Sequence, residues 1–574
     1  MNKLTAWLTI FALSFALAIA TSCTELAKDF SVTAESPKLA RPSSQSPMSL
    51  GINLAGVADW SSEIPFVDAF KSTKQWMTQC LASELGCSRP WNTNEYDKLD
   101  LDENGWVKSL PSLEDPAEYT RVGTLMFRNI DHYPGGKYLV LYDGEGTIEY
   151  GFDAHKDPLA SQSGRDVIDV TPSNAGIYLA ITSTDPQQTG NYIRNVRVIP
   201  EQYETSYRQA VFNPEFIDKI RPFTTIRFIN WMATSNSEQS EWQNRPTTQS
   251  YTYSFYEGGV PLETLVELVN RLKVHPWFNM PHQATDEYIR NFAAMVKDSL
   301  DSQLKVYVEY SNEVWNVGFS QSHWVEQQGI AQWPNSASGN VAKRLNWYGK
   351  RTAEMCELWK GVFDEQSDRV VCVLASQSAN SWTAKQSLDC PLWSEGPCYQ
   401  HGIDALAIAP YFGGYLGDQD NEQQVQNWTT EQLFEEIESG GVLVDGPAGG
   451  AIHQSVEAMK TNYALASQRN LQLFAYEGGQ HLVGRPGVEN NEQLTNLFID
   501  ANRDPKMYAA YLEYLNYWQT SGGTLFMNFC DISRPDKWGS WGALEHVSQE
   551  SSPKYDALLV FTEKAPDSLR PSHP

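Results

Sequence analysis

The sequence predicts an α/β fold: a (β/α)8 TIM barrel, with an antiparallel β-sandwich domain inserted between barrel strands 1 and 2. Eight short apolar runs, rich in β-branched and aromatic residues, have the composition of buried parallel strands. Amphipathic helix patterns separate these runs, and alternating strands and helices form parallel sheets with right-handed crossovers. An open, doubly wound sheet is the alternative, but no glycine-rich dinucleotide fingerprint follows the first run.

The strand candidates are residues 51–56, 224–231, 275–281, 305–313, 369–377, 403–412, 472–479 and 523–529. Helix patterns lie between them. Apolar residues recur at i, i+3 and i+4 spacing from Leu262 to Leu272, and a capping box formed by Thr429 and Gln432 opens another helix. In a barrel of this type the functional site lies at the C-terminal ends of the strands.

One connection has a different character. Strand 1 begins at Gly51 and strand 2 only at Thr224, a gap far longer than one helical connection. Within residues 95–203, short alternating runs are separated by Asp-Gly, Pro-Gly-Gly and Ser-Asn-Ala-Gly turns, which is the pattern of a β-sandwich. Such a domain could bind carbohydrate, but we favour a wall or brace of the cleft, because the sequence reveals no exposed aromatic stripe.

A short acidic motif within this region imitates the first half of a calcium loop: Asp100, Asp102, Asn104 and Gly105. Pro111 stands where the loop would need a bidentate glutamate. We therefore interpret the segment as a turn and expect no metal site.

The N-terminus predicts export. The apolar run 8–20 follows Lys3 and is typical of a secretory signal, too short for a membrane span. Ala20-Thr21-Ser22-Cys23 resembles a bacterial lipobox, although Ala20 replaces the usual leucine, so Cys23 is the expected lipidation site. A rival cut at Ala18-Ile19-Ala20 would release a soluble protein. We expect an outer-membrane or cell-surface lipoprotein, or otherwise a periplasmic or secreted protein.

These features divide the chain into six expected segments. They are a signal peptide (1–22), a Ser- and Pro-rich flexible tether (23–50), the start of the barrel (51–94), the β-sandwich (95–203), the rest of the barrel (204–565) and a C-terminal tail (566–574).

The net charge excludes some classes of binding partner, and the cysteine spacing suggests disulfides, which form in oxidising compartments. The net charge of −27 argues against nucleic acid and polyanionic substrates, which require a basic surface. We expect a monomer that contacts membranes only through its lipid anchor. Two cysteine pairs close in sequence, Cys80 with Cys87 and Cys390 with Cys398, are disulfide candidates. Cys356, Cys372 and Cys530 fall in predicted helices or strands and are expected to be buried thiols.

Two glutamates stand at strand ends. Asn312 and Glu313 are the last two residues of the fourth strand candidate, and Glu477 lies near the end of the seventh. Strands 4 and 7 face each other across the mouth of an eight-stranded barrel, and carboxyl groups about 5 Å apart there would suit a retaining glycosidase. A surface glutamate in a turn is the alternative for either residue alone.

On these residues the chain resembles the clan A glycoside hydrolases, the retaining (β/α)8 enzymes related to the family-five cellulases and mannanases. The resemblance covers about 51–80 and 210–550 and implies that Glu313 is the acid/base and Glu477 the nucleophile. It further implies substrate-binding roles for Asn312, Arg227, His282, Tyr411, and Trp538 or Trp541. Alternatively, Arg227 is part of an internal ion pair, His282 a loop residue, and the two tryptophans core aromatics. Ala409 departs from the family-five pattern, which often has histidine there.

The sequence therefore predicts an exported retaining β-glycosidase that acts on a neutral polysaccharide or its oligosaccharides and needs no cofactor or metal. The alternative is a non-catalytic carbohydrate-binding surface lipoprotein on the same scaffold, which would have no need for both Glu313 and Glu477. A structural or adhesive protein is disfavoured because long repeats are missing.

Overall fold

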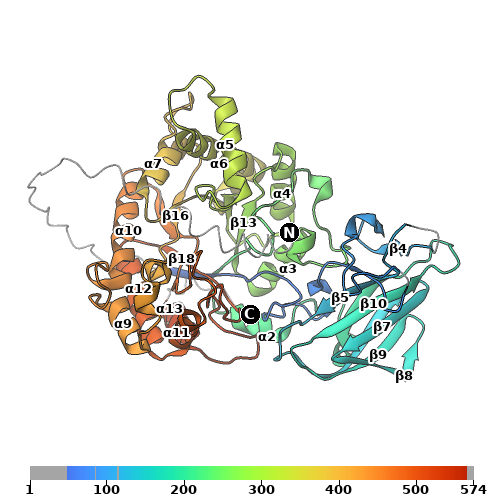
Figure 1. The fold of residues 1–574 in the computed structure, drawn as a ribbon. Coiled ribbons are helices and arrows are strands. Elements are labelled where there is room, and N and C mark those ends of the chain that lie inside the picture. The colour runs from blue at the N-terminus through green and yellow to red at the C-terminus, as the bar shows by residue number, and fades with distance from the viewer. Residues whose placement is uncertain (1–47, 85, 113–115, 565–574) are drawn as a thin grey trace, which may run out of the picture.

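The computed structural model describes residues 48–84, 86–112 and 116–564, and its parts are arranged as Figure 1 shows. Eight strands form a closed barrel, in which each strand pairs in parallel with the next and the last with the first. They are β1 (Ser49–Asn53), β12 (Thr225–Arg227), β13 (His275–Met280), β14 (Val306–Tyr310), β15 (Val370–Ser376), β16 (Ala405–Ile408), β17 (Gln472–Ala475) and β18 (Leu525–Asn528). The predicted (β/α)8 barrel is confirmed.

Helices follow the strands along the chain. They are α2 (Pro214–Ile220), α3 (Leu262–Leu272), α4 (Asp286–Ser299), α5 (Ser320–Gln332), α6 (Asn340–Phe363), α7 (Ser381–Asp389), α8 (Glu422–Val425), α9 (Thr430–Glu438), α10 (Gly450–Ser467), α11 (Glu492–Arg503), α12 (Lys506–Thr520) and α13 (Pro553–Lys564). The Thr429–Gln432 capping box forms as expected at the start of α9.

Alternation along each barrel strand separates an inner from an outer core. In β14, Val306, Val308 and Tyr310 are buried in the outer hydrophobic cluster that the helices cover. Tyr307 instead packs with the inner cluster, which includes Trp277 and Phe474 from neighbouring strands. Glu309 has the same inward direction as Tyr307, so β14 places a carboxyl group inside the barrel.

Between β1 and β12 the chain forms two four-stranded antiparallel sheets, which lie to one side of the barrel in Figure 1. One has the order β2 (Met77–Gln79), β5 (Arg121–Met126), β10 (Ile177–Thr184), β7 (Gly146–Phe152). The other has the order β11 (Arg194–Pro200), β6 (Gly136–Asp143), β9 (Arg165–Val170), β8 (Ala154–Gln162). Because β2 pairs with β5, the antiparallel part begins before residue 95, the expected boundary. A strand of three residues is too short to show alternation in the sequence.

The entry and exit of this insertion lie side by side. Phe66 and Phe212 form an antiparallel bridge, and the Val67 amide donates a hydrogen bond to the Val211 carbonyl at 3.0 Å. The insertion therefore leaves and re-enters the barrel at one place.

The segment that imitates a calcium loop is a turn between two short strands, β3 (Asp100–Leu101) and β4 (Val107–Ser109). The Asp102 carboxylate accepts hydrogen bonds from the backbone amides of Asn104 and Trp106, each at 2.9 Å. Its second oxygen accepts a hydrogen bond from the Tyr192 hydroxyl at 2.8 Å. These donors satisfy the carboxylate without a cation.

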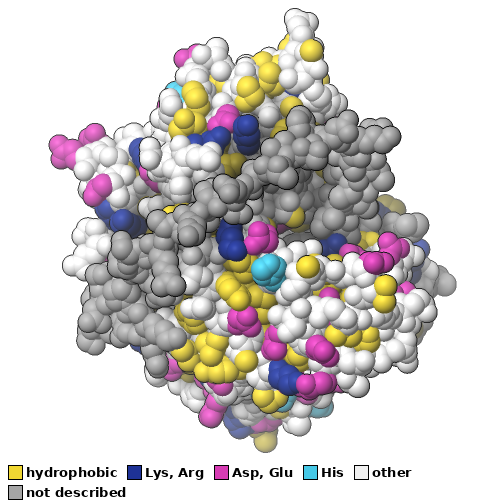
Figure 2. All heavy atoms as spheres, turned by 90° about the vertical axis from the view of Figure 1, so that its left-hand side faces the viewer, with side chains coloured by type: hydrophobic (Ala, Val, Ile, Leu, Met, Phe, Trp, Pro, Cys, Tyr) yellow, Lys and Arg dark blue, Asp and Glu magenta, His cyan; other side chains and the backbone are white. Residues whose placement is uncertain are grey.

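The expected signal peptide, Cys23, most of the tether, and the tail 566–574 lie outside the described residues. Within the described part of the chain, no helix has both the length and the apolarity to cross a bilayer. Figure 2 shows acidic and basic side chains interspersed on one face of the molecule.

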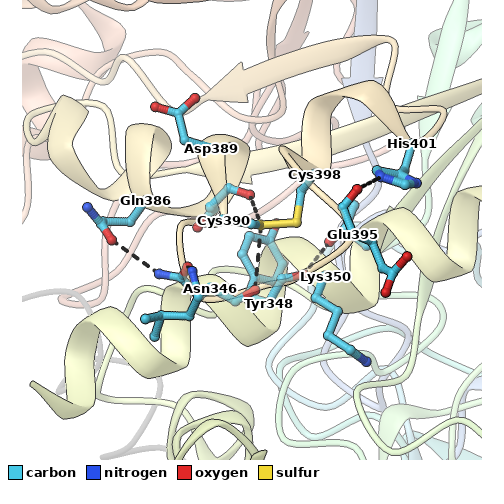
Figure 3. The surroundings of a disulfide bond; sticks show 12 residues. Asn346, Tyr348, Lys350, Gln386, Asp389, Cys390, Glu395, Cys398 and His401 are labelled. Atoms are coloured by element: carbon cyan, nitrogen blue, oxygen red, sulfur yellow. Dashed lines mark hydrogen bonds between the residues drawn. A yellow bond between two sulfur atoms is a disulfide. The ribbon is translucent and has the colours of Figure 1, made fainter. Parts of the chain in front are cut away.

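The structure joins both expected cysteine pairs. Cys80 is bonded to Cys87, and Cys390 to Cys398, while Cys356, Cys372 and Cys530 are buried thiols. The Cys390–Cys398 bond lies where α7 meets α6 (Figure 3). Here Gly349 of α6 allows a close approach, since a Cβ on it would lie 1.9 Å from the Ser387 carbonyl oxygen.

Removing this disulfide should destabilise the barrel. Closing a loop of this size stabilises a fold by about 2–3 kcal/mol, chiefly by restricting the unfolded chain. The double variant Cys390→Ser/Cys398→Ser should therefore unfold at a lower temperature than the parent in calorimetry, by a few degrees. Ser394→Ala, in the same exposed loop, is the control and should leave the transition unchanged. An equal transition for parent and double variant would contradict a stabilising role.

Candidate active site

Glu313 lies just beyond the C-terminal end of β14 and is 2% exposed. The turn that delivers it has two residues in the left-handed backbone region, Ser311 with φ 61° and Glu313 with φ 43°. Such a conformation costs a non-glycine residue roughly 1 kcal/mol or more, and strain of this kind is concentrated at functional sites. The Glu313 carboxyl accepts hydrogen bonds from the Tyr476 hydroxyl and the Asn316 side-chain amide, both at 2.9 Å.

Glu477 lies two residues beyond the end of β17 and is 4% exposed. Arg227 Nη1 donates to its Oε1 at 2.9 Å, and the Tyr411 hydroxyl donates to its Oε2 at 3.1 Å. Because a cation and a hydroxyl both donate to Glu477, its surroundings favour the ionised carboxylate. The neighbouring Tyr476 faces Glu313, so consecutive residues of this strand end serve the two carboxyl groups.

Arg227, at the end of β12, is the centre of the polar network and is fully buried. Besides Glu477, it forms a salt bridge with Glu309 inside the barrel, with Nη2 3.0 Å from Glu309 Oε2. Nη2 also donates to Asn312 Oδ1 at 3.0 Å, and Nη1 donates to Asn53 Oδ1 at 3.1 Å. Arg227 is therefore an internal ion-pair member that also donates to Glu477, and its substrate-binding role stays a prediction.

Two further donors satisfy Glu309. Trp277 Nε1 and Asn279 Nδ2 each donate to Glu309 Oε2 at 2.9 Å. A buried carboxylate with a bidentate arginine and two neutral donors has the partners that a charge in an apolar interior requires.

The two glutamates at the strand ends have different electrostatic surroundings, which affect their pKa values differently. Burial, and secondly the charge of Glu477, raise the pKa of Glu313 to about 8. Burial also raises the pKa of Glu477 above its usual value, but the charge and hydrogen bond of Arg227 and the hydrogen bond of Tyr411 oppose this rise. Because Arg227 binds Glu477 and makes no hydrogen bond or salt bridge to Glu313, Glu313 holds the proton when only one of the two is protonated.

The other predicted site residues lie at the same end of the barrel, at different depths. Asn312 is buried, and its Nδ2 donates to Ser235 Oγ at 3.3 Å. Tyr411 contacts Glu477 directly. Trp541 packs edge-on against Tyr411, with ring centroids 5.8 Å apart, so its indole lies next to the tyrosine that donates to Glu477. Trp538 accepts a hydrogen bond from the Trp541 indole at its carbonyl, while its own ring lies under Lys537.

His282 follows β13 and is buried. Its ring packs edge-on against Trp324, with centroids 5.5 Å apart. Burial lowers the pKa of His282 to about 4, so the ring is neutral at neutral pH. Its Nδ1 is buried and has no hydrogen-bond partner within the described structure.

A second pair of buried carboxyl groups, Glu63 and Asp531, lies in the loops after β1 and β18. Trp231 Nε1 donates to Glu63 Oε1 at 3.1 Å, and the Ala55 amide donates to Asp531 Oδ1 at 2.8 Å. Burial raises the pKa of both, that of Asp531 to about 7. Arg227 forms no salt bridge with Glu63 or Asp531. Their hydrogen bonds to Trp231 and Ala55 instead connect the loops that follow β1, β12 and β18.

Among the described residues, the one group with the spacing of a metal site is Cys80, Cys87 and Glu118. Its two sulfurs are joined in a disulfide, so they are not available as ligands.

No family model matches the chain, and no curated protein matches it. Three of the solved structures to which it is similar are glycoside hydrolases. One is a GH5-4 broad-specificity endoglucanase from Clostridium acetobutylicum, with 11% identity and a TM-score of 0.34 over 61% of this chain and 89% of that one. Another is a GH5 xyloglucan-specific β-1,4-glucanase from a ruminal metagenomic library, with 9% identity and a TM-score of 0.35 over 61% and 86%.

The third is a modular endo-β-1,4-mannanase of family 26 from Cellulomonas fimi, with 8% identity and a TM-score of 0.31 over 59% of this chain and 62% of that one. Families 5 and 26 belong to the clan that the sequence resembles. The closed barrel itself establishes the (β/α)8 fold that this resemblance implies.

The raised pKa of Glu313 predicts a pH-dependent stability. An unfolded glutamate has a pKa near about 4.3, so the protonated native side chain contributes stability that is fully present below this pH. The contribution is lost as the pH rises through about 8, the value in the fold. Glu313→Gln stays neutral, so its melting temperature relative to that of the parent should increase steadily from pH 5 to pH 8.5.

Exposed Glu550 supplies the control, since Glu550→Gln should show a difference from the parent that does not change with pH. A pH-independent difference for Glu313→Gln as well would mean that Glu313 does not take up its proton in this window.

Proposed function

We propose that the protein is a retaining β-glycosidase that cleaves a neutral polysaccharide or its oligosaccharides by double displacement. Glu477 is the nucleophile and Glu313 the acid/base. The observation that carries the proposal is the unequal partnering of two buried carboxyl groups at the ends of β14 and β17. Arg227 and Tyr411 donate to Glu477, whereas Glu313 has neutral partners only. One group is thus prepared to attack and the other to give a proton.

In the first step, a Glu477 oxygen forms a bond to the anomeric carbon while the glycosidic C–O bond breaks. The Glu313 proton passes to the departing oxygen, so the leaving group departs as a neutral hydroxyl. The products of the step are a glycosyl ester on Glu477 and an ionised Glu313.

In the second step, Glu313 takes a proton from water, whose oxygen bonds to the anomeric carbon as the ester bond breaks. Glu477 regains its negative charge and its salt bridge with Arg227. While the ester exists, Glu477 is neutral and no longer raises the pKa of Glu313 by charge repulsion, so Glu313 becomes a carboxylate able to act as base.

Neighbouring groups support a sugar ring as the substrate. Trp541 offers an aromatic face beside Tyr411, and Asn312 has one amide oxygen committed to Arg227 and its nitrogen in a long contact of 3.3 Å. That nitrogen is suited to donate to a sugar hydroxyl next to the reacting carbon. The net charge of −27 favours a neutral polymer over an acidic one.

The two carboxyl groups give different kinetic signatures when removed. Glu477→Ala cannot form the ester, so turnover should fall by several orders of magnitude for all substrates. Added azide should restore it and give a glycosyl azide of inverted configuration. Glu313→Ala should lose about 10²–10⁴-fold on substrates with poor leaving groups but cleave dinitrophenyl glycosides rapidly to the ester, and azide should then release a product of retained configuration.

Glu477→Gln is the matched control, since its amide fills the space that azide needs and should not be rescued. Net inversion by the parent enzyme would exclude direct attack by Glu477. Binding of polysaccharides without any hydrolysis would instead establish the non-catalytic, carbohydrate-binding alternative.

We further propose that the protein is exported and anchored by lipid at Cys23, a placement that rests on the N-terminal sequence alone. Labelled palmitate should enter the parent protein expressed in a bacterial host and should not enter Cys23→Ala. Ser22→Ala, one residue away, is the control and should keep the label. Release of unlabelled parent protein into the soluble fraction would favour the cut at Ala18-Ile19-Ala20.

A further inference from the structure

The insertion carries three aromatic side chains in mutual contact at its surface: Trp91, Phe152 and Tyr178, here called the aromatic patch. Their ring centroids are 5.5–5.6 Å apart in each pairing. Trp91 and Phe152 are each 48% exposed. Isolated exposed aromatics are ordinary on protein surfaces, but a contiguous group marks a binding surface.

The patch lies over one face of the sheet β2–β5–β10–β7, which Phe152, opposite Ile177 in the register, reaches from the end of β7 where its backbone is left-handed. Tyr178 is opposite Gly151 in the register, and Ala180 is opposite both Gly123 and Glu149. Since directly opposed residues share a face, this face combines the aromatic rings with small residues and a charged one. A Cβ on Gly123 would lie 2.9 Å from the Tyr178 ring, so the glycine lets that ring lie close to the sheet.

Trp91 is held in place before any ligand arrives. Gln79 donates a hydrogen bond to the Trp91 carbonyl at 3.0 Å and accepts one from the Tyr178 hydroxyl at 2.5 Å. The Cys80–Cys87 disulfide closes the loop before Trp91, and the Thr93 amide after it donates to the Thr78 carbonyl at 2.8 Å. A preformed aromatic surface loses little conformational entropy on binding.

Phe152 is costly to the fold in two respects. It has φ 59°, in the left-handed region that bulky side chains rarely adopt, and it is a large apolar residue that remains 48% exposed. Asparagine or glycine would suit this backbone better. The fold therefore gives no reason for phenylalanine at this position, whereas a ligand that packs on the ring would.

The chemistry of the surrounding groups fits a neutral sugar chain. Aromatic faces pack on the C–H faces of sugar rings, and polar groups at the edge bind hydroxyls. Arg121 and Glu149, paired at 2.7 Å, lie on the same face, and within the described structure the Trp91 indole N–H has no hydrogen-bond partner. Glu149 and the chain's net charge of −27 disfavour an acidic polymer or nucleic acid.

We propose that the aromatic patch is a second carbohydrate site, outside the barrel, that binds a neutral polysaccharide chain. The choice of polysaccharide as the occupant rests on the proposed function, while the existence of a binding surface rests on the patch itself. The site would hold the polymer near the barrel between cleavage events and would take no part in the chemistry.

The experiment measures binding of the full-length protein in a Glu477→Gln background, which prevents hydrolysis. Electrophoresis in native gels containing mixed-linkage β-glucan, xyloglucan, arabinoxylan or galactomannan gives the affinity for each. Trp91→Ala combined with Phe152→Asn should weaken binding of at least one polymer about tenfold or more. Trp382→Ala, an equally exposed tryptophan on α7 at 44%, should not.

Stability and hydrolysis separate the possible results. Because asparagine tolerates the backbone of Phe152, Phe152→Asn should not lower the melting temperature, and the double variant should remain folded. With Glu477 restored, it should cleave a small aryl glycoside at the parental rate, since that substrate reaches only the barrel. If the parent itself did not cleave the aryl glycoside, the proposed function would be refuted, but the proposal of a binding surface at the patch would not.

Three results would overturn the proposal. They are unchanged polysaccharide binding by the double variant, no binding of any polymer of the panel by the parent, and conversion of a dimeric parent to a monomer by the two substitutions. The last would identify the patch as a contact between copies of the chain.

Discussion

The site depends on the burial of one arginine between two carboxylates. Arg227 is fully buried and lies between Glu309 inside the barrel and Glu477 at its mouth. A guanidinium stays charged in any protein environment, so two anions beside it can be accommodated where a single unpaired carboxylate could not. Trp277 and Asn279 then satisfy Glu309 with neutral donors, which leaves one edge of the arginine to serve Glu477 and Asn312.

This arrangement explains why two glutamates at equivalent strand ends differ in acidity. Both are buried, and burial alone would raise both pKa values. The arginine acts directly on one of them, and the carboxylate so stabilised acts on the other by repulsion. Replacement of Glu309 would change the difference in pKa between Glu313 and Glu477, because Arg227 would then interact with one carboxylate instead of two. The interior ion pair would in this sense contribute to the proposed chemistry, although Glu309 is fully buried inside the barrel.

The sequence was sufficient for the parts that local patterns determine. Compact apolar runs predict the parallel strands and the strand ends that carry Glu313 and Glu477, and alternation with turn residues predicts the inserted antiparallel sheets. Glu309 was missed because a single charged residue within an apolar run does not reveal which face of the strand its side chain lies on. Its position, four residues before Glu313 and one strand from Trp277, was the only available signal. Tyr476 and Asn316 were missed because their hydrogen bonds depend on how two loops meet, which no local pattern encodes.

The aromatic patch shows the same limit more clearly. Trp91, Phe152 and Tyr178 stand far apart in the sequence, after a disulfide loop, at the end of β7 and within β10, so no stripe could be recognised before the sheet register was known. The structure also fixes the insertion to the barrel at a second place. Arg128 Nε binds Asp59 Oδ2 at 2.8 Å, and Arg534, from the loop after β18, donates to the Asn129 carbonyl at 2.7 Å.

These contacts join the insertion to loops at the mouth of the barrel, on the side where Asn53 supports Arg227. A polymer bound at the patch would therefore be held by a body that is attached to the barrel at its entry, at its exit and at this contact. Attachment at several places limits the motion of the insertion relative to the carboxyl pair, which is the condition under which a second binding site raises the local concentration of substrate. An insertion joined only by its two chain crossings would swing, and the same aromatic surface would then contribute much less to capture.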